Sequence, residues 1–207
     1  MSAPDRQAAL EQYRRRAAVY DLELALFEPL RRAAVARLAL QRGETVLDCG
    51  CGTGLSLPLL RAAVGAPGRV VGIEQSPEML AQARRRIARC GWRNVELIGA
   101  PAEAARWAGR ADAALFHFTH DLLQRPEAVA NALGPLRRGA RVVATGLCWA
   151  PRWALAVNAA VLMAARRSTT TLVGLDRPWR LLEARLGPMR VQRRLLGAVY
   201  LACGAKP

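Results

Sequence analysis

The sequence predicts an α/β protein with a doubly wound, mostly parallel sheet, an antiparallel hairpin at the C-terminus and a helical cap at the N-terminus. Three observations predict this fold. Short apolar runs alternate with helix-type segments between residues 44 and 147, as in parallel strands joined by helices. A glycine-rich turn follows the first run. The last two runs, within residues 189–205, are separated only by a short glycine turn, which favours a hairpin.

The N-terminal residues 1–42 are expected to form the cap. Residues 5–40 have helical spacing and few turn residues, so they predict two helices. The division between these helices is expected near Tyr20–Asp21 or near Glu28–Pro29. The early acidic residues and the lack of an apolar core segment predict that the N-terminus is not a signal peptide.

The parallel strands are expected where the apolar runs lie. These runs are residues 44–50, 68–74, 94–99, 112–118 and 140–147. The helices that join or follow them are expected at residues 55–64, 77–90, 126–136, from about 150 to 167, and 178–186. In the third of these helices, Gly134–Pro135 weakens the helical pattern.

The helix after the second strand has clear signals at both ends. Ser76 is suited to the N-cap, Pro77 to the first helical position, and Glu78 to the positive end of the helix dipole. Arginines crowd its C-terminal half, and Gly91 is expected to end it.

The composition supports a full core but leaves the meaning of the charge open. Hydrophobic residues make up 52% of the chain, and the net charge is +15. Lys206 is the single lysine, so almost all of the positive charge is arginine. This charge indicates either attraction to an anionic partner, such as RNA, an acidic lipid surface or an anionic substrate, or a coding bias with solvated helix faces.

The cysteines and the apolar segments predict a soluble, cytoplasmic protein. The five cysteines, an odd number at irregular spacing, favour a reducing compartment. Cys49 and Cys51 lack a second pair of ligands at suitable spacing, so no metal site is expected. The most apolar late stretch, residues 153–165, is shorter than the ~20 residues needed to span a bilayer.

The turn after the first strand indicates a ligand close to the backbone. Gly50, Gly52 and Gly54 alternate there, and position 55 lacks the third glycine of a dinucleotide-binding turn. Asp48, which leads into the turn, suits an ammonium group better than a pyrophosphate. Glu74, at the end of the second strand, can accept hydrogen bonds from ribose hydroxyls. A ribose, an amino group and no pyrophosphate together fit S-adenosylmethionine.

The order of the motifs resembles one family. The segments VLDCGCGTG, VVGIEQSPEML, NVELIGAPAE and DAALFHFTHDLL follow one another as in the class I S-adenosylmethionine-dependent methyltransferases. GTGLSLPLL and SPEMLAQAR are similar to the subgroup that methylates quinone precursors, phospholipid head groups and other small molecules. The resemblance covers about residues 44–144 and implies a Rossmann-like fold there. The length of the chain favours one domain of residues 1–207, with a cofactor-binding core at 43–147 and substrate-side helices and the hairpin at 148–207.

The resemblance also implies which residues contact the cofactor. They are Asp48, Gly50, Cys51 and Gly52 at the methionine and ribose, Glu74 at the ribose, Gln75 and Met79 near the adenine, Ala100 and Pro101 at its edge, and His117 at the cofactor or the pocket wall. Many relatives carry aspartate at the position of Ala100. Here a backbone carbonyl or Glu103 is expected to receive the adenine amino group, unless the adenine is held less specifically.

The candidate catalytic residues follow the fourth strand. His120 with Asp121 is the candidate general base for an oxygen or amine nucleophile. The alternative is that this histidine is merely hydrogen-bonded in the structure. Tyr13, Tyr20 and Phe27 of the N-terminal helices are candidates to close over the pocket on the substrate side. The candidates for an apolar substrate wall are Trp149, Trp153 and Met163, although at helical spacing all such residues also fit a plain core.

The function expected from these features is methyl transfer to a small, hydrophobic or aromatic acceptor, with a lipid or quinone-like molecule favoured. The alternatives are a non-catalytic S-adenosylmethionine-binding regulatory module and an RNA methyltransferase. Nucleic acid is disfavoured as a partner because HFTHDLL lacks the Asn/Asp-Pro-Pro-aromatic turn and no aromatic residues interleave a basic stripe. Peripheral contact with an anionic membrane surface is a further expectation.

Overall fold

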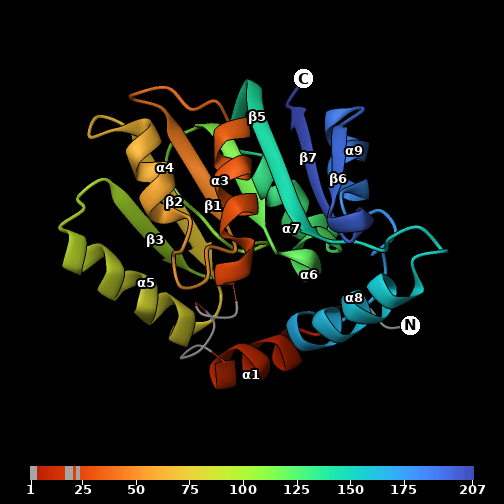
Figure 1. The fold of residues 1–207 in the computed structure, drawn as a ribbon. Helices are drawn as coiled ribbons and strands as arrows, with labels where there is room; N and C mark the ends of the chain where they lie inside the picture. Colours follow the sequence, from red (N-terminus) through yellow and green to blue (C-terminus); the bar gives the residue numbers. More distant parts are fainter. Residues whose placement is uncertain (1–3, 17–20, 22–23) are drawn as a thin grey trace.

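The computed structural model describes residues 4–16, 21 and 24–207, without the side chains of residues 13, 15 and 16. Its centre is a seven-stranded sheet with the order β3-β2-β1-β4-β5-β7-β6 (Figure 1). The strands are β1 (Thr45–Cys49), β2 (Arg69–Glu74), β3 (Val95–Gly99), β4 (Ala111–His117), β5 (Leu136–Leu147), β6 (Arg190–Arg194) and β7 (Val199–Ala205).

The pairing of the strands confirms the predicted fold class. β1 to β5 pair in parallel, β7 runs antiparallel to β5, and β6 runs antiparallel to β7 at the edge. The chain builds outward from β1 to β3 and then returns to place β4 on the other side of β1. The strand order therefore reverses between β1 and β4.

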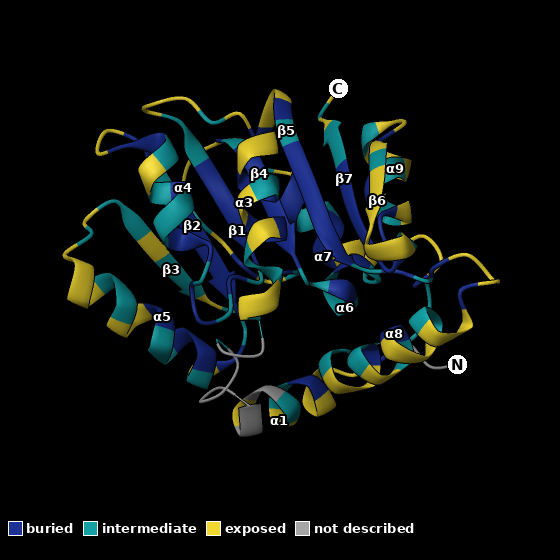
Figure 2. Ribbon diagram, viewed as in Figure 1, coloured by how far each residue is buried: buried dark blue, intermediate teal, exposed yellow. Residues whose placement is uncertain are grey.

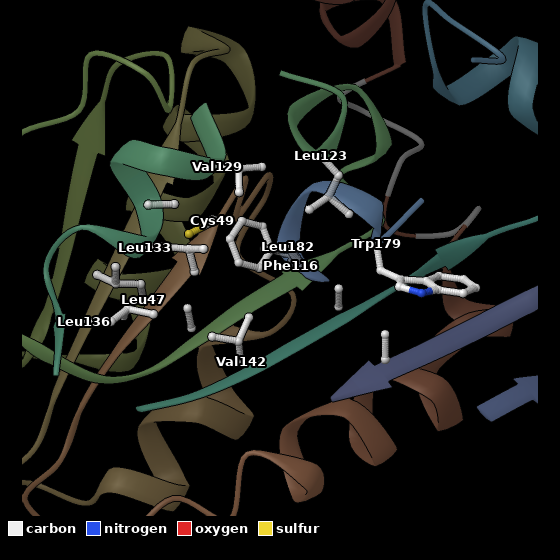
Figure 3. Packing of buried hydrophobic residues seen from close by; sticks show 14 of the residues in the cluster. Leu47, Cys49, Phe116, Leu123, Val129, Leu133, Leu136, Val142, Trp179 and Leu182 are labelled. Carbon is white, nitrogen blue, oxygen red and sulfur yellow. The ribbon is translucent and has the colours of Figure 1, made fainter. Parts of the chain in front are cut away.

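Helices cover both faces of the sheet because the parallel strands are apolar on both sides. On one face lie α3 (Glu28–Arg37), α4 (Leu57–Val64) and α5 (Pro77–Cys90). On the other lie α6 (His120–Leu123), α7 (Pro126–Leu133) and α9 (Arg180–Leu186), over the buried cluster of Figure 3. Neighbouring residues of β1 alternate between the two cores, with Val46 in the first and Leu47 in the second.

Two helices lie beyond the carboxyl ends of the parallel strands rather than on a face. They are α1 (Arg6–Arg16) and α8 (Leu155–Ser168), which run close to each other in Figure 1. The side-chain amide of Gln12 donates to the carbonyls of Arg166 and Arg167, and the backbone N–H of Asp5 donates to Thr170 Oγ1 at 2.9 Å. This layer closes the end of the sheet.

The predicted ends of α5 are confirmed. Ser76 Oγ accepts a hydrogen bond from the backbone N–H of Met79 at 3.3 Å, and Gly91 takes a left-handed conformation with φ 63°. Both features satisfy backbone groups that a helix leaves open at its ends.

Several boundaries differ from the expectation. α8 (Leu155–Ser168) begins later than the expected residue 150, and α9 begins at Arg180 rather than 178. α4 begins at Leu57 rather than 55, because the glycine turn extends to Ser56. α7 ends at Leu133 rather than 136, and β5 begins at Leu136, before the expected residue 140. Pro135, which cannot donate a hydrogen bond, separates the two elements. The short helix α6 was not predicted, because its four residues show no helical period.

The described part of the chain has neither a membrane-spanning helix nor a cluster of metal ligands. No helix there is long and apolar enough to cross a bilayer. No group of three or more His, Cys, Asp or Glu side chains in those residues could hold a metal ion. All five cysteines are free thiols.

Candidate functional site

A cavity opens at the carboxyl ends of β1, β2 and β4, where the strand order reverses. It encloses about 770 Å³, including the open space at its mouth. The loops after β1, β3 and β4 line it together with the end of β2, and Asp5 and Ala9 add the N-terminal part of the chain to the lining. Open α/β sheets bind their ligands at such a reversal, so this cavity is the candidate functional site.

The glycine turn forms the floor shared by this cavity and a smaller one beside it. Gly50 and Gly52 line both cavities and have φ angles of 76° and 57°. A Cβ atom on Gly50 would lie 2.5 Å from Thr119 Cγ2, so a side chain there is excluded by space as well as by conformation. Gly54 serves packing instead, because its Cβ would meet Leu57 and Ala83. The first two glycines therefore bring bare backbone to the cavity.

Glu74 places a carboxylate at the edge of this backbone. Its Oε2 accepts a hydrogen bond from the N–H of Gly52 at 2.9 Å, and its Oε1 accepts one from the N–H of Ser76 at 2.7 Å. The side chain is almost fully buried and lines the larger cavity. Burial raises the pKa of the Glu74 carboxyl, and the backbone N–H groups of Ser76, Gly52 and Gln75 work against that rise. Glu74 is thus held in one orientation with lone pairs left for a ligand.

The smaller cavity contains a buried pair of opposite charges. Asp48 and Arg31 both line it, next to Cys51 and His117. Within the described residues, Asp48 Oδ2 and Arg31 Nε and Nη2 have no hydrogen-bond partner, although Arg31 Nη1 contacts Glu28. Burial raises the pKa of Asp48 to about 7, against the lowering effect of Arg31. Buried polar atoms without partners are costly, so these atoms indicate a zwitterionic ligand.

Sequence reasoning missed Arg31, although a signal for it exists. In α3 the positions of Leu30, Ala34, Val35 and Leu38 form the buried apolar side. Arg31 lies on the same side and is only 2% exposed. A charged residue within the apolar stripe of an amphipathic helix is rarely buried without a purpose, so the helical period alone could have pointed to it.

The predicted adenine-side residues lie together at the larger cavity. Gln75, Met79 and Ala100 line it, and Glu103 lines it as well. Glu103 forms an ion pair with Arg125 at 3.1 Å, and Arg125 also donates to the carbonyl of Pro4 at 3.0 Å. Pro101 does not belong to the lining of either described cavity.

His117 faces the smaller cavity from the end of β4. Its Nδ1 lies 2.7 Å from Thr145 Oγ1, and its Nε2 has no partner among the described residues. Burial, together with the charge of Arg31, lowers the pKa of His117 to about 3. The ring is therefore neutral near pH 7, with one nitrogen held by Thr145 and the other open to the cavity.

The candidate pair His120 and Asp121 bonds to the segment after α8. His120 Nε2 lies 3.0 Å from the carbonyl of Val173. Asp121 accepts hydrogen bonds from the N–H and the hydroxyl of Thr170, at 2.9 and 2.7 Å. Asp121 lines the larger cavity, whereas His120 lines neither described cavity. Both side chains hold residues 170–173 against the site, and their catalytic role stays a prediction.

The expected substrate wall is only partly where the sequence places it. Phe27 packs on Phe118, a lining residue, with ring centroids 4.7 Å apart. Trp149 is half-buried, and its backbone N–H donates to the carbonyl of Leu175. Trp153 and Met163 line neither described cavity and lie on the outer surface, 76% and 65% exposed, so their place in the substrate wall stays a prediction. The side chain of Tyr13 and the whole of Tyr20 lie outside the described residues.

Comparisons with known proteins agree with this geometry. Residues 46–139 match a family model described as a methyltransferase domain. A stretch of 93 residues is 37% identical to the aklanonic acid methyltransferase DauC of Streptomyces sp. (strain C5), over 44% of this chain and 42% of that protein. Another of 76 residues is 41% identical to an arsenite methyltransferase of Halobacterium salinarum, over 37% of this chain and 18% of that protein. The chain thus spans less than half the length of these curated relatives.

A solved structure extends the likeness to almost the whole chain. It is the N-methyltransferase NodS of Bradyrhizobium japonicum WM9 in complex with S-adenosyl-L-homocysteine, with a TM-score of 0.71 and 17% identity. The match covers 96% of this chain and 98% of that one, which establishes a common fold. Residues 46–139 are therefore similar in sequence to a methyltransferase domain, and the chain shares the fold of this N-methyltransferase.

Proposed function

We propose that this chain transfers a methyl group from S-adenosylmethionine to an oxygen, nitrogen or carbon atom of a small hydrophobic or aromatic acceptor, with a lipid or quinone-like molecule favoured. The observation that carries the proposal is the arrangement of charges around the glycine loop. Glu74 lies on one side of the loop, and Asp48 and Arg31 lie on the other with open polar atoms.

These residues fit the three parts of the cofactor. The ammonium and carboxylate of its amino acid part would pair with Asp48 and Arg31, and its ribose hydroxyls would donate to Glu74. The adenine would lie among Met79, Ala100 and Glu103. When bound, the cofactor supplies an electrophilic methyl group on a cationic sulfur. The bare backbone of the glycine loop lets such a ligand approach closely.

The chain itself then has to orient an acceptor and keep water away. Orientation of the reacting atoms can lower a barrier by ~7–11 kcal/mol, whereas a general base adds about 10²–10⁴-fold. His117 is suited to contact the amino acid part of the cofactor, because its neutral ring lines the smaller cavity and Thr145 fixes it. In this proposal His120 and Asp121 keep the 170–173 segment in place, and His120 remains the candidate base.

The apolar character of the acceptor is supported by the side of the cavity formed after β4. Phe118 and Leu122 line it there, and Ile73 lines it from β2. Two relatives are named for arsenite and aklanonic acid, which favours a small acceptor over a macromolecule. An RNA acceptor remains the second candidate, because short stretches also match 23S rRNA methyltransferases and the net charge is +15.

A methyl-transfer screen tests the proposed function. The chain is incubated with S-adenosylmethionine carrying a labelled methyl group and with separate pools of hydrophobic phenols, quinols, lipid amines and total RNA. We expect labelled product and S-adenosylhomocysteine with an apolar pool only. Label on RNA alone would establish the second candidate. Calorimetric binding of the cofactor without turnover in any pool, including an extract of cell metabolites, would point to a non-catalytic binding module.

The pKa of Asp48 predicts how cofactor binding depends on pH. In the free protein the pKa of Asp48 is about 7, and the ammonium group of the cofactor would bind the ionised carboxylate. Binding therefore releases a proton, and affinity falls as the pH falls through this pKa. Between about pH 8 and about pH 6 the ionised fraction drops roughly tenfold, so we expect the Kd for S-adenosylhomocysteine to rise roughly tenfold.

Calorimetry over that pH range measures the effect, and Asp48→Asn is its control. The variant should bind more weakly at high pH and lose most of the pH dependence, since His117 stays neutral throughout. Any dependence that remains in the variant reports Glu74, whose pKa is also raised by burial. An affinity of the wild type that is flat over the range would contradict the pairing of Asp48 with the ammonium group.

A further inference from the structure

The large apolar side chains that are most exposed gather in two short segments. Of the six large hydrophobic residues that are highly exposed in the described part of the chain, five come from residues 153–163 and 195–196. The five residues are Trp153, Leu155, Met163, Leu195 and Leu196, each at least 65% exposed, and we call them the apolar tip. Isolated exposed leucines are common in proteins, but such a concentration marks an interaction surface.

The β6–β7 turn lies against residues 148–151, which lead into the first segment. A Cβ atom on Gly197 would lie 2.9 Å from Pro151 Cδ, so the β6–β7 turn packs directly on the chain that leads into α8. The N–H of Cys148 donates to the carbonyl of Ala198, and Arg193 Nη1 donates to the carbonyl of Trp149 at 2.8 Å. The exposed residues of α8 lie along the side that faces away from the sheet (Figure 2).

The turn of the apolar tip has an unfavourable backbone. Leu195 and Leu196 have φ angles of 50° and 54°, followed by Gly197 at 94°. The left-handed region is disfavoured for leucine, and asparagine or glycine normally occupies it. A turn built for stability alone would therefore not carry two leucines that also point into solvent. The strained backbone and the exposure of the two leucine side chains together indicate that these side chains bind a partner.

The charge around the tip identifies the chemistry of that partner. Residues 150–207 contain ten basic and two acidic residues, and Glu183, one of the acids, is paired with Arg177. Arg152 and Arg194 are exposed next to the apolar residues, and Arg166 and Arg167 end α8. An apolar face with an arginine rim is the pattern of a surface that lies in the interface of an anionic bilayer.

We propose that the apolar tip docks this protein on an anionic lipid bilayer. A second copy of the chain is a poor occupant, since two such basic faces would repel each other. RNA would use the arginines but would gain little from leucine and methionine, which offer neither charge nor a stacking ring. The apolar tip lies at the end of the molecule where the cavity opens. α8 contacts α1 through Gln12, and Thr170 contacts Asp5, which lines the cavity. Docking would therefore bring the site close to molecules dissolved in the bilayer.

Vesicle flotation of the full chain without cofactor tests this proposal independently of methyl transfer. The probes are vesicles of phosphatidylcholine with about 30% phosphatidylglycerol and vesicles of phosphatidylcholine alone. We expect binding to the anionic vesicles and at least about tenfold weaker binding to the neutral ones. Failure to bind anionic vesicles would overturn the proposal and leave the proposed enzyme function untouched.

The variants separate the apolar contribution from the charge and from stability. Leu195→Asn with Leu196→Asn should weaken vesicle binding at least about tenfold and leave Tm unchanged or raised, because asparagine tolerates the left-handed conformation. Trp153→Ser should also weaken vesicle binding, and this variant leaves the backbone of the β6–β7 turn unchanged. Arg194→Gln should weaken it more than Arg85→Gln, a matched exposed arginine of α5 at the opposite end of the sheet.

Further outcomes would also overturn the proposal. They are wild-type affinity in the double leucine variant, equal effects of the two arginine variants, and concentration-dependent dimerisation that the leucine variant abolishes while vesicles remain unbound. The last of these would assign the tip to a second copy of the chain. Salt-sensitive RNA binding that ignores the leucines, again without vesicle binding, would assign the basic rim to nucleic acid.

Discussion

Replacement of Glu74 by alanine is expected to raise the Kd for S-adenosylhomocysteine at least about 100-fold. A hydrogen bond to a charged group contributes ~1.5–3 kcal/mol, and the two ribose hydroxyls would lose one each. A total of about 3–6 kcal/mol corresponds to a factor between about 10² and 10⁴ in Kd. The variant also removes the acceptor for the N–H groups of Gly52 and Ser76, so the glycine loop loses its anchor as well.

The matched variants show whether the loss comes from the carboxylate itself. Glu74→Gln keeps the size of the side chain, but its amide NH₂ would face one of the two backbone N–H donors. It should bind more weakly than wild type and more tightly than Glu74→Ala. Glu96→Ala removes a half-exposed carboxylate on the neighbouring strand β3, where it pairs with Arg69, and should leave Kd unchanged.

Isothermal calorimetry gives the affinities, and thermal unfolding with and without S-adenosylhomocysteine gives a second readout. A ligand that binds only the folded state raises Tm, so the wild type should gain stability and Glu74→Ala should gain almost none. An unchanged Kd in a folded Glu74→Ala protein would remove the ribose clamp from the site, and with it the main argument for a nucleoside ligand.

The part of the site that sequence reasoning predicted is local in the chain. Asp48, Gly50 and Gly52 lie within one loop, and Glu74 ends the next strand, where a fixed topology brings it back to that loop. The alternation of apolar runs predicted the sheet for the same reason, since each run needs only its own pattern to identify it. Such features can be predicted from short windows of sequence.

The part that was missed depends on contacts between distant residues. Arg31 reaches the smaller cavity from a helix of the cap; the helical period marks its position as buried, but only the tertiary fold shows that it lies beside Asp48. The sequence suggested that Asp121 would support His120 as a base. In the structure Asp121 instead accepts hydrogen bonds from Thr170, 49 positions away. Trp153 was a candidate for the substrate wall, yet it lies just before α8, beyond the carboxyl ends of the strands, and is exposed to solvent. Tertiary placement decided each of these cases.

Arg31→Met is expected to weaken S-adenosylhomocysteine about 30- to 300-fold and to leave 5′-methylthioadenosine almost unaffected. The second ligand lacks the amino acid part, so it cannot use a guanidinium that pairs with a carboxylate. Loss of a buried, charge-assisted hydrogen bond costs ~2–3 kcal/mol or more. Glu74→Ala, in contrast, should weaken both ligands, because both contain the ribose. The two variants together therefore divide the site into a nucleoside half and an amino acid half.

Arg32→Met is the matched control for this second variant. Arg32 follows Arg31 in α3, forms an ion pair with the same Glu28 at 3.0 Å, and is 65% exposed. It should change neither affinity.

Arg31→Met should also fold, because methionine fills most of the same space and removes a buried guanidinium with two nitrogens that lack a described partner. The Asp48 carboxyl would then lose the neighbour that lowers its pKa and would become protonated rather than remain a buried charge. Equal weakening of both ligands would mean that Arg31 supports the glycine loop instead of binding the carboxylate, and the smaller cavity would no longer count as an amino acid site.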